Sequence, residues 1–565
     1  MRSVPAWPTT VAITSLLLAV APRARAGGYE VPDLGAEAMG RGAAFTAKAD
    51  NGTALLYNVA GFAKQRGTSL QLDVNVVSDS FTFARAGAYT DNAQNPATPW
   101  GGRTFPKSEN LGAAAVIPTL TASTDFGAFE RLTLAAGLLT PAGSGNRVFP
   151  LNVGSGASGA PNPARYDSVS GDSLAVYPTL AGAYRVLPEL DIGLGGHLVY
   201  GSFDALAISY ADFGATSCPN AEFRGCDVDS RLRASGTSFA ASAGALWRPS
   251  NTLEFGLMVR SPWKMRAEGN VSTTPPSAQP APIPDAKATL LVGFPLVLRA
   301  GGRYRVLEGE RESGDVELDA TYEAWSGAEG FGPTVDIPSI DIGGKASPVK
   351  SVSPHGYGDT YSVRGGGAYN WDAPALGLGA VMTVRAGAFH DSTATSNAYT
   401  RVDVNTLDKF GVTVGAGLKS GAFTFNVAYA EIFSPSRTVT NGAIRPSNGL
   451  KNGDPVGANG ALLGAVNNGR YEGHMRTLSL GIAVTFGAAP ATAKEAPAKP
   501  NASLDETAPK DARAAEDERD AARDDDERQA PPRDAEPRDE EPVQDAAPAP
   551  PRRKPAKKPR PRPRR

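Results

Sequence analysis

The sequence predicts an all-β protein: a 14-stranded antiparallel transmembrane β-barrel with an N-terminal plug in its lumen and a disordered C-terminal tail. Three observations lead to this prediction. Apolar residues recur at every second position rather than with the helical period of 3.6. The gaps between the alternating segments are short and long in turn, as in outer-membrane barrels. An export signal precedes the first segment, and no later apolar run is long enough for a membrane-spanning helix.

Residues 1–26 are predicted to be a signal peptide. Arg2 provides a positive start, residues 11–21 form an apolar segment too short to span a membrane, and Ala24-Arg25-Ala26 matches a cleavage site of small residues. The mature chain is therefore expected to begin at Gly27, outside the cytoplasm. The alternative is an N-terminal membrane anchor.

Residues 27–67 do not alternate and are predicted to form the plug, or hatch. They hold too many apolar residues for a tail hanging in the periplasm, which is the alternative; Phe45, Leu55 and Phe62 are examples. Asp33 and Asp50 each precede a short helix-like segment and are expected to cap it.

Residues 68–487 are predicted to form the barrel. In residues 69–76 every even position is apolar and every odd position is polar. The inward positions are often Gly, Ala, Thr or charged, which suits a polar lumen inside a lipid-facing wall. An even number of strands places both termini on the periplasmic side of the bacterial outer membrane. The strands are expected near residues 68–77, 111–124, 131–142, 173–186, 189–204, 237–249, 252–268, 287–306, 315–327, 359–371, 379–391, 407–420, 421–433 and 474–487.

Strands eight to eleven of this prediction carry charges on their inward face. An arginine facing lipid would cost ~2–4 kcal/mol at the membrane midplane, so these side chains are expected to face the lumen as a charge ladder. The ladder is either a set of structural ion pairs or a grip on the plug or on a ligand carboxylate. Its members are Arg299, Arg303, Glu317, Asp319, Arg364 and Arg385.

Two long loops, 78–110 and 143–172, are predicted to capture ligand. Solvated loops are normally polar, whereas these contain Phe81, Phe83, Trp100 and Phe149. In the third long loop Cys218 and Cys226 are expected to form a disulfide, because the compartment is oxidising. The alternative is two free thiols.

Residues 488–565 are predicted to be a disordered periplasmic tail rich in Pro, Ala and charge. The segment has no aromatic residue and cannot bury enough apolar surface to fold. Residues 501–550 hold 17 acidic and 7 basic residues, and residues 551–565 hold 9 basic and no acidic ones. The tail is either a solvated spacer or a basic tip that docks on an anionic polymer such as the cell wall.

No enzyme, metal site or cofactor is predicted. The GDSL string at 171–174 lacks the Asp-x-x-His pair that such esterases use, and 415–420 lacks the Gly-Lys adjacency of a phosphate loop. Four scattered His residues argue against a His-rich metal site. A net charge of −2 excludes a broadly basic nucleic-acid binder.

The segment GRGAAFTAKADNGTALLYNVAGFA (40–63) resembles the hatch of the FadL/TodX family of outer-membrane transporters for hydrophobic compounds. The family pattern G-R-x-A…D…N-P-A-G-L matches Gly40, Arg41, Asp50, Asn58 and Gly61, with Val59 in place of the family's proline. Weaker matches occur at 260–262 and 319–326, so the resemblance covers roughly residues 27–487.

The resemblance implies transport of hydrophobic compounds, such as long-chain fatty acids or aromatic hydrocarbons, by passive diffusion with lateral exit into the bilayer. The implied partners are the hydrophobic solute, outer-membrane lipid and lipopolysaccharide. The alternative is a barrel that acts as a surface adhesin or envelope anchor. An open aqueous porin fits less well, because a plug would block it.

Overall fold

The computed structural model describes residues 34–487 except 96–97, 154–158, 212–215, 221, 279, 281, 328–331, 343–344, 378 and 447–462. The predicted signal peptide (1–26), the first part of the predicted plug (27–33) and the predicted tail (488–565) lie outside the described residues.

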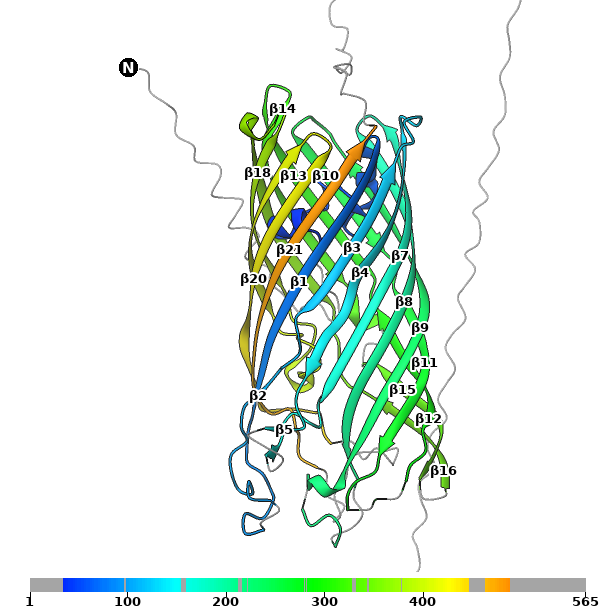
Figure 1. Cartoon of the computed structure of the whole chain (residues 1–565), viewed down its shortest axis with the longest axis vertical. Coiled ribbons are helices and arrows are strands. Elements are labelled where there is room, and N and C mark those ends of the chain that lie inside the picture. The colour runs from blue at the N-terminus through cyan, green and yellow to red at the C-terminus, as the bar shows by residue number, and fades with distance from the viewer. Residues whose placement is uncertain are drawn as a thin grey trace, which may run out of the picture. The chain divides into compact units, whose positions relative to one another are not determined.

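The wall is a closed barrel of fourteen antiparallel strands, which confirms the predicted fold class (Figure 1). It closes because β1 (Thr68–Arg85) pairs with β21 (Gly469–Phe486) along the whole of both strands. Because the first and last strands pair with each other, neither is left as a free edge in lipid, where an unpaired backbone group is costly. The other strands of the wall are β3 (Ala115–Thr124), β4 (Leu132–Val148), β7 (Ser170–Leu187), β8 (Leu190–Tyr210), β9 (Asp227–Trp247), β10 (Leu253–Arg260) continued by β11 (Trp263–Thr274), β12 (Ala286–Phe294) continued by β13 (Val297–Glu308), β14 (Arg311–Glu323), β17 (Thr360–Asp372), β18 (Val381–Asp391), β19 (Lys409–Ser420) and β20 (Phe423–Val439).

The two ends of the barrel differ in their connections. One end has short turns, such as 188–189, 309–310 and 421–422. The other, which we call the long-loop end, lies at the bottom of Figure 1 and carries all the long connections. The long loops contain β2 (Ser108–Glu109), β5 (Asn152–Val153), β6 (Ala160–Pro161), η2 (Arg224–Cys226), η3 (Trp325–Gly327), β15 (Thr334–Ile342), β16 (Lys345–Val352) and η5 (Asn397–Tyr399), whereas η4 (Pro374–Leu376) lies in a turn of the other end.

Several strand boundaries differ from the prediction. The expected strands 252–268 and 287–306 are each broken, at Pro262 and Pro295, because proline cannot donate to a ladder. The expected strands 68–77, 237–249 and 421–433 are too short, since their pairing continues past the alternating residues toward the long-loop end. The expected loop 328–358 contains the β15–β16 hairpin, which pairs with β12.

Burial follows the alternation of the sequence. On β1 the polar Gln71, Asp73 and Asn75 are buried, whereas Leu70 and Leu72 are 44% and 41% exposed. On β1 polar side chains therefore face the lumen and apolar ones face outward, the arrangement of a wall surrounded by lipid. No helix among the described residues is long and apolar enough to cross a membrane.

The described part of the predicted plug lies inside the barrel, toward the short-turn end (Figure 1). It contains α2 (Ala36–Gly40), α3 (Ala54–Tyr57) and η1 (Val59–Lys64). α2 packs against β19 and β20, and η1 packs against β7, β8 and β9. The expected cap at Asp50 is wrong: Thr53 is the N-cap of α3, without a side-chain bond, and Asp50 pairs with Lys48 instead.

Candidate functional site

Arg41, which directly follows α2, joins the plug to the wall. Its guanidinium donates two hydrogen bonds to the Asp315 carboxylate (3.0 and 2.8 Å) and one to Glu317 (3.2 Å). All three side chains are fully buried. Burial alone would lower the pKa of Arg41, but the two carboxylates raise it above its usual value. The two parallel bonds to Asp315 neutralise the buried charge of Arg41 and fix the orientation of its side chain against the wall.

The wall carboxylates also hold the plug backbone. Glu317 accepts from the Ala47 amide (2.7 Å), and Asp319 accepts from the amides of Phe45 and Thr46 (2.9 Å each). Charge-assisted bonds to amides are stronger than neutral ones. Two members of the predicted ladder therefore contact the plug directly.

The arginines of the ladder complete this network. Arg303 bonds to Asp315 (2.5 Å) and Glu254 (2.8 Å), so it lies between wall carboxylates. The other three arginines each contact the plug. The Arg299 guanidinium lies 5.3 Å from the ring centroid of Tyr57, and Arg385 pairs with Glu37 (3.3 Å). Arg364 donates one hydrogen bond to the Gly42 carbonyl of the plug (3.4 Å) and another to Asp391 of the wall (2.8 Å). The ladder thus combines structural ion pairs with a grip on the plug.

The remaining hatch residues shape the plug itself. Asn58 donates to the Thr46 carbonyl (2.9 Å) and to Ala245 O on β9 (3.0 Å). Gly40 and Gly61 stand at close approaches: a Cβ on Gly40 would lie 3.0 Å from the Gly415 Cα on β19, and one on Gly61 would lie 1.9 Å from the Ala49 carbonyl oxygen. A larger residue at either position would push the plug out of place.

Most of the aromatic residues expected to capture ligand are buried in the structure. Phe81, Phe83 and Phe149 are each 0% exposed and pack in one cluster, where Phe83 stacks on Tyr471 at 4.5 Å between ring centroids. The expected placement of Phe81 and Phe83 in the loop 78–110 is wrong, because β1 extends to Arg85 and carries both residues into the wall. Trp100 is partly buried and donates to Asp91 (2.6 Å). Cys218 and Cys226 are joined by a disulfide.

A cavity of about 610 Å³ lies at the long-loop end, and we call it the outer cavity. The inner faces of β7, β8, β9, β11 and β12 and the β15–β16 hairpin line it. The apolar part of this lining suits an apolar solute, and polar residues such as Asp172, Ser230 and Thr273 also line the cavity. Its apolar residues include Phe203, Leu232, Val271, Leu290, Val292, Phe294, Val335, Ile337, Ile340 and Val349.

A charged cluster closes part of the rim of the outer cavity. Arg401 bonds to Asp167 (2.9 Å) and Asp403 (3.3 Å), and Asp403 also contacts the His355 ring (2.9 Å). Burial raises the pKa of Asp167 to about 6, against the lowering effect of Arg401. Burial would also raise the pKa of Asp403, but His355 and Arg401 hold it well below its usual value. The cluster ties three long loops together.

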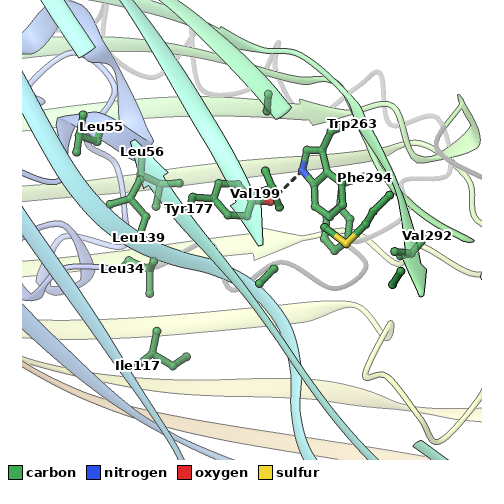
Figure 2. Close-up of a cluster of buried hydrophobic side chains, with 14 of the residues drawn as sticks. Leu34, Leu55, Leu56, Ile117, Leu139, Tyr177, Val199, Trp263, Val292 and Phe294 are labelled. Atoms are coloured by element: carbon green, nitrogen blue, oxygen red, sulfur yellow. Dashed lines mark hydrogen bonds between the residues drawn. The ribbon is translucent and has the colours of Figure 1, made fainter. Parts of the chain in front are cut away.

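A row of aromatic side chains, which we call the aromatic floor, starts at Phe294 in the lining of the outer cavity. Phe294 stacks on Trp263 with ring centroids 4.3 Å apart, and the Trp263 indole N–H donates to the Tyr177 hydroxyl (2.9 Å; Figure 2). On the other side Phe294 contacts Trp325, which contacts Tyr357 (5.7 and 5.3 Å between centroids). These rings pack in one continuous row, and the Trp263–Tyr177 hydrogen bond holds one end of it.

Beyond Tyr177 the buried apolar cluster continues to the plug. Figure 2 shows Leu139 of β4 beside Leu56 of the plug, with Leu34 of the plug and Ile117 of β3 further along. Leu139 is 1% exposed and Ile117 9%. Buried apolar side chains therefore form a continuous cluster from the outer cavity to the inner side of β3 and β4.

At this place β3 and β4 part. They pair only from Leu120 opposite Leu138 to Thr124 opposite Leu134. Residues 115–119 of β3 pair with β1, whereas residues 139–145 of β4 follow β7 with two irregularities. Toward the long-loop end the strands are joined again, because the Leu111 amide donates to the Val148 carbonyl (2.8 Å). We call the unpaired stretch, 115–119 and 139–145, the wall gap.

Proline explains part of the wall gap. Pro118 lies on β3 and Pro141 on β4, one at each side of it. Neither can donate a backbone hydrogen bond, and proline within sheets is confined to edges and bulges. On the outward face of the wall at this place, Val116 is 65% and Leu138 is 42% exposed, so this face is apolar.

Sequence reasoning missed Asp315, the main partner of Arg41, although it continues the alternation of Glu317 and Asp319 on β14. It also missed Glu254, which pairs with Lys64 of the plug (2.9 Å). The described residues contain no group of three His, Cys, Asp or Glu side chains that could hold a metal ion.

Comparison with known proteins identifies the family. The family model described as outer membrane protein transport protein (OMPP1/FadL/TodX) matches residues 17–468. A search of curated proteins finds no match.

Solved structures share the fold. A Pseudomonas aeruginosa FadL homologue is 17% identical, with 81% of this chain and 100% of that chain covered and a TM-score of 0.63. The Pseudomonas putida toluene transporter TodX is 14% identical (80% and 98% covered, TM-score 0.55), and the Ralstonia pickettii toluene transporter TbuX is 11% identical (81% and 99%, TM-score 0.53). Since the family model spans most of the chain and the barrel carries an apolar lumenal lining, this chain belongs to the OMPP1/FadL/TodX family and is an outer-membrane transporter of hydrophobic compounds.

Proposed function

We propose that hydrophobic solutes diffuse passively through this protein, from the outer cavity past the aromatic floor and sideways through the wall gap into the bilayer. The long-loop end then faces the outside, and both termini face the periplasm. Long-chain fatty acids and aromatic hydrocarbons are both candidate solutes.

The observation that carries the proposal is the continuity of the apolar lining. It links the outer cavity, the floor at Trp263 and Phe294, and the wall gap at Ile117 and Leu139. The route straight through the lumen is occupied by the plug, which the charge ladder holds. A solute without polar groups gains free energy along an apolar lining at ~0.8 kcal/mol per buried methylene, so no other energy source is needed.

The outer cavity is expected to bind an apolar probe, and Leu290→Asn is expected to weaken that binding. The substitution places an amide among the apolar lining residues, which costs ~1–3 kcal/mol when the probe covers it. Affinity for a fluorescent fatty acid, titrated into purified full-length protein, should fall about tenfold. Leu290→Met keeps the lining apolar and is the matched control.

The same titration with a neutral aromatic probe distinguishes the solute classes. If the protein binds the fatty acid but not the neutral probe, its solutes are carboxylates. If Leu290→Asn weakens the binding of both probes equally, its solutes are apolar compounds in general. If the unmodified protein binds neither probe, the transport proposal fails and a surface adhesin or envelope anchor becomes the better account.

A further inference from the structure

An ion pair crosses the inner side of the wall at the long-loop end of the wall gap. Arg147 of β4 bonds to Asp79 of β1 (2.5 Å), beyond the point where β3 lies between these two strands, since β3 begins only at Ala115. Asp79 alternates with exposed residues and shares the buried side of Val77 and Phe81, which places it on the lumenal face. We call Asp79 and Arg147 the exit pair.

The exit pair is incompletely hydrogen-bonded. Arg147 is 3% exposed, and its Nε and Nη1 atoms find no partner among the described residues. The same holds for Oδ1 of Asp79. Asp79 nevertheless keeps 18% of its side chain exposed, so the pair borders open space rather than packed wall. Because a buried donor or acceptor without a partner is costly, a polar group that reaches the pair is stabilised there.

A second ion pair of β1 shows that such open atoms are not general at this end of the barrel. Arg85 donates to both carboxylate oxygens of Glu222 (2.8 and 2.6 Å). These two side chains are buried to a similar degree, with 6% and 15% exposed. None of the buried atoms of these two described side chains lacks a partner. The exit pair therefore differs from its neighbour in hydrogen bonding and not in burial.

The charges around the exit pair are balanced. Lys409 of β19 interacts electrostatically with both residues of the pair and with two further carboxylates, one of which pairs with an arginine. An anionic head therefore finds no excess of positive charge here. The charged side chains of this group are Arg147, Arg364 and Lys409 with Asp79, Glu323 and Asp391.

A hydroxyl group matches the open atoms of the exit pair. Its O–H donates one hydrogen bond and its oxygen accepts others. A single hydroxyl would therefore donate to Asp79 Oδ1 and accept from an N–H of Arg147 at the same time. An ether or a hydrocarbon would leave Oδ1 of Asp79 without a donor.

The apolar side of the site lies next to the exit pair. Val77 is 7% exposed and precedes Asp79 by two residues, so both point to the same side of β1. Ile117 and Leu139 of the wall gap belong to the same buried cluster as Val77. An apolar chain that lies in the wall gap thus has one of its ends beside the exit pair.

We propose that the exit pair holds the hydroxyl head of an amphiphilic solute, such as a long-chain alcohol, while its apolar chain enters the wall gap. The hydroxyl donates to Asp79 and accepts from Arg147, and the chain lies against Val77, Ile117 and Leu139. The site rests on the lateral path proposed above and adds a class of solute to it: apolar molecules that end in one uncharged group able to donate and to accept.

The test compares two photoreactive probes on full-length protein in outer-membrane vesicles. One is a long-chain alcohol with a diazirine next to the hydroxyl, and the other is its methyl ether, which accepts but does not donate. Labels are mapped by mass spectrometry. The alcohol is expected to label β1 around Val77 and Phe81 more strongly than the ether, on the order of tenfold, because the ether leaves a buried acceptor unpaired.

Variants assign this preference to the exit pair. In Asp79→Leu/Arg147→Met the two probes are expected to label β1 equally. The matched control, Glu222→Leu/Arg85→Met, removes the fully bonded pair of the same strand and is expected to keep the preference for the alcohol. Heat-dependent mobility on electrophoresis shows that both variants are folded barrels.

Equal labelling of Val77 and Phe81 by both probes in the unmodified protein would overturn the proposal, since water alone would then serve the open atoms. Stronger labelling by the corresponding carboxylate would also overturn it, because the pair would then select negative charge. Labels from both probes at Ile117 and Leu139 would still support lateral exit in either case. A preference for the alcohol without any label at Ile117 and Leu139 would refute lateral exit and leave the hydroxyl site standing.

Discussion

The substitution Arg41→Met is expected to turn a poorly conducting barrel into a conducting one. It leaves Asp315 and Glu317 buried without their plug partner, and removing one member of a buried ion pair costs ~3–5 kcal/mol. The equilibrium between the plugged and the open state would shift toward the open state by on the order of a hundredfold or more. Single-channel recordings in planar bilayers should therefore show a stable rise in conductance.

The control is Lys48→Gln. Lys48 is also a cation of the plug, but its partners Glu37 and Asp50 belong to the plug as well. Conductance should stay near that of the unmodified protein. If Arg41→Met inserts as a folded barrel and its conductance does not change, the plug is not held by the Asp315–Glu317 pair.

Leu139→Asn is expected to lower uptake of a hydrophobic solute about tenfold, while binding in the outer cavity persists. Leu139 is 1% exposed and lies at the wall gap, beyond the aromatic floor. An uncompensated amide in a dry apolar passage costs a passing solute ~1–3 kcal/mol. Uptake of a fluorescent fatty acid by cells that carry the variant, together with its binding by purified protein, separates passage from capture.

Leu139→Met keeps the passage apolar at similar volume and should preserve uptake. If Leu139→Asn takes up the solute as fast as the unmodified protein, solutes leave the lumen at another place. Loss of both binding and uptake would show that Leu139 acts on the fold or the outer cavity rather than on the exit.

The strands of the wall could be predicted from the sequence, because the alternation on strands such as β1 indicates directly which side faces lipid. It was insufficient at the long-loop end, where strands need not alternate once they leave the bilayer. For this reason the alternation predicts β9 and β20 too short and places Phe81 and Phe83 in a loop, although both lie on β1 and are buried.

The candidate site was predictable only in part. The inward charges of β14 were visible from the alternation, but their partner Arg41 lies 274 residues away from Asp315, and no local pattern reports such a contact. The wall gap had a local signal that was not used: Pro118 and Pro141 within two neighbouring strands. The outer cavity had none, because its lining comes from seven strands and several loops whose alternation looks like that of any other part of the wall.

The most direct test of the proposed path is photo-crosslinking with an apolar solute that carries a diazirine. Full-length protein in outer-membrane vesicles is labelled and the modified residues are mapped by mass spectrometry. The account predicts labels in the outer cavity, at residues such as Leu290 and Val292, and at the wall gap, at Ile117 and Leu139, with none on the periplasmic side of the plug around Lys48 and Asp50. Labels around Lys48 and Asp50 without labels at the wall gap would contradict lateral exit and show that the solute passes straight through the lumen.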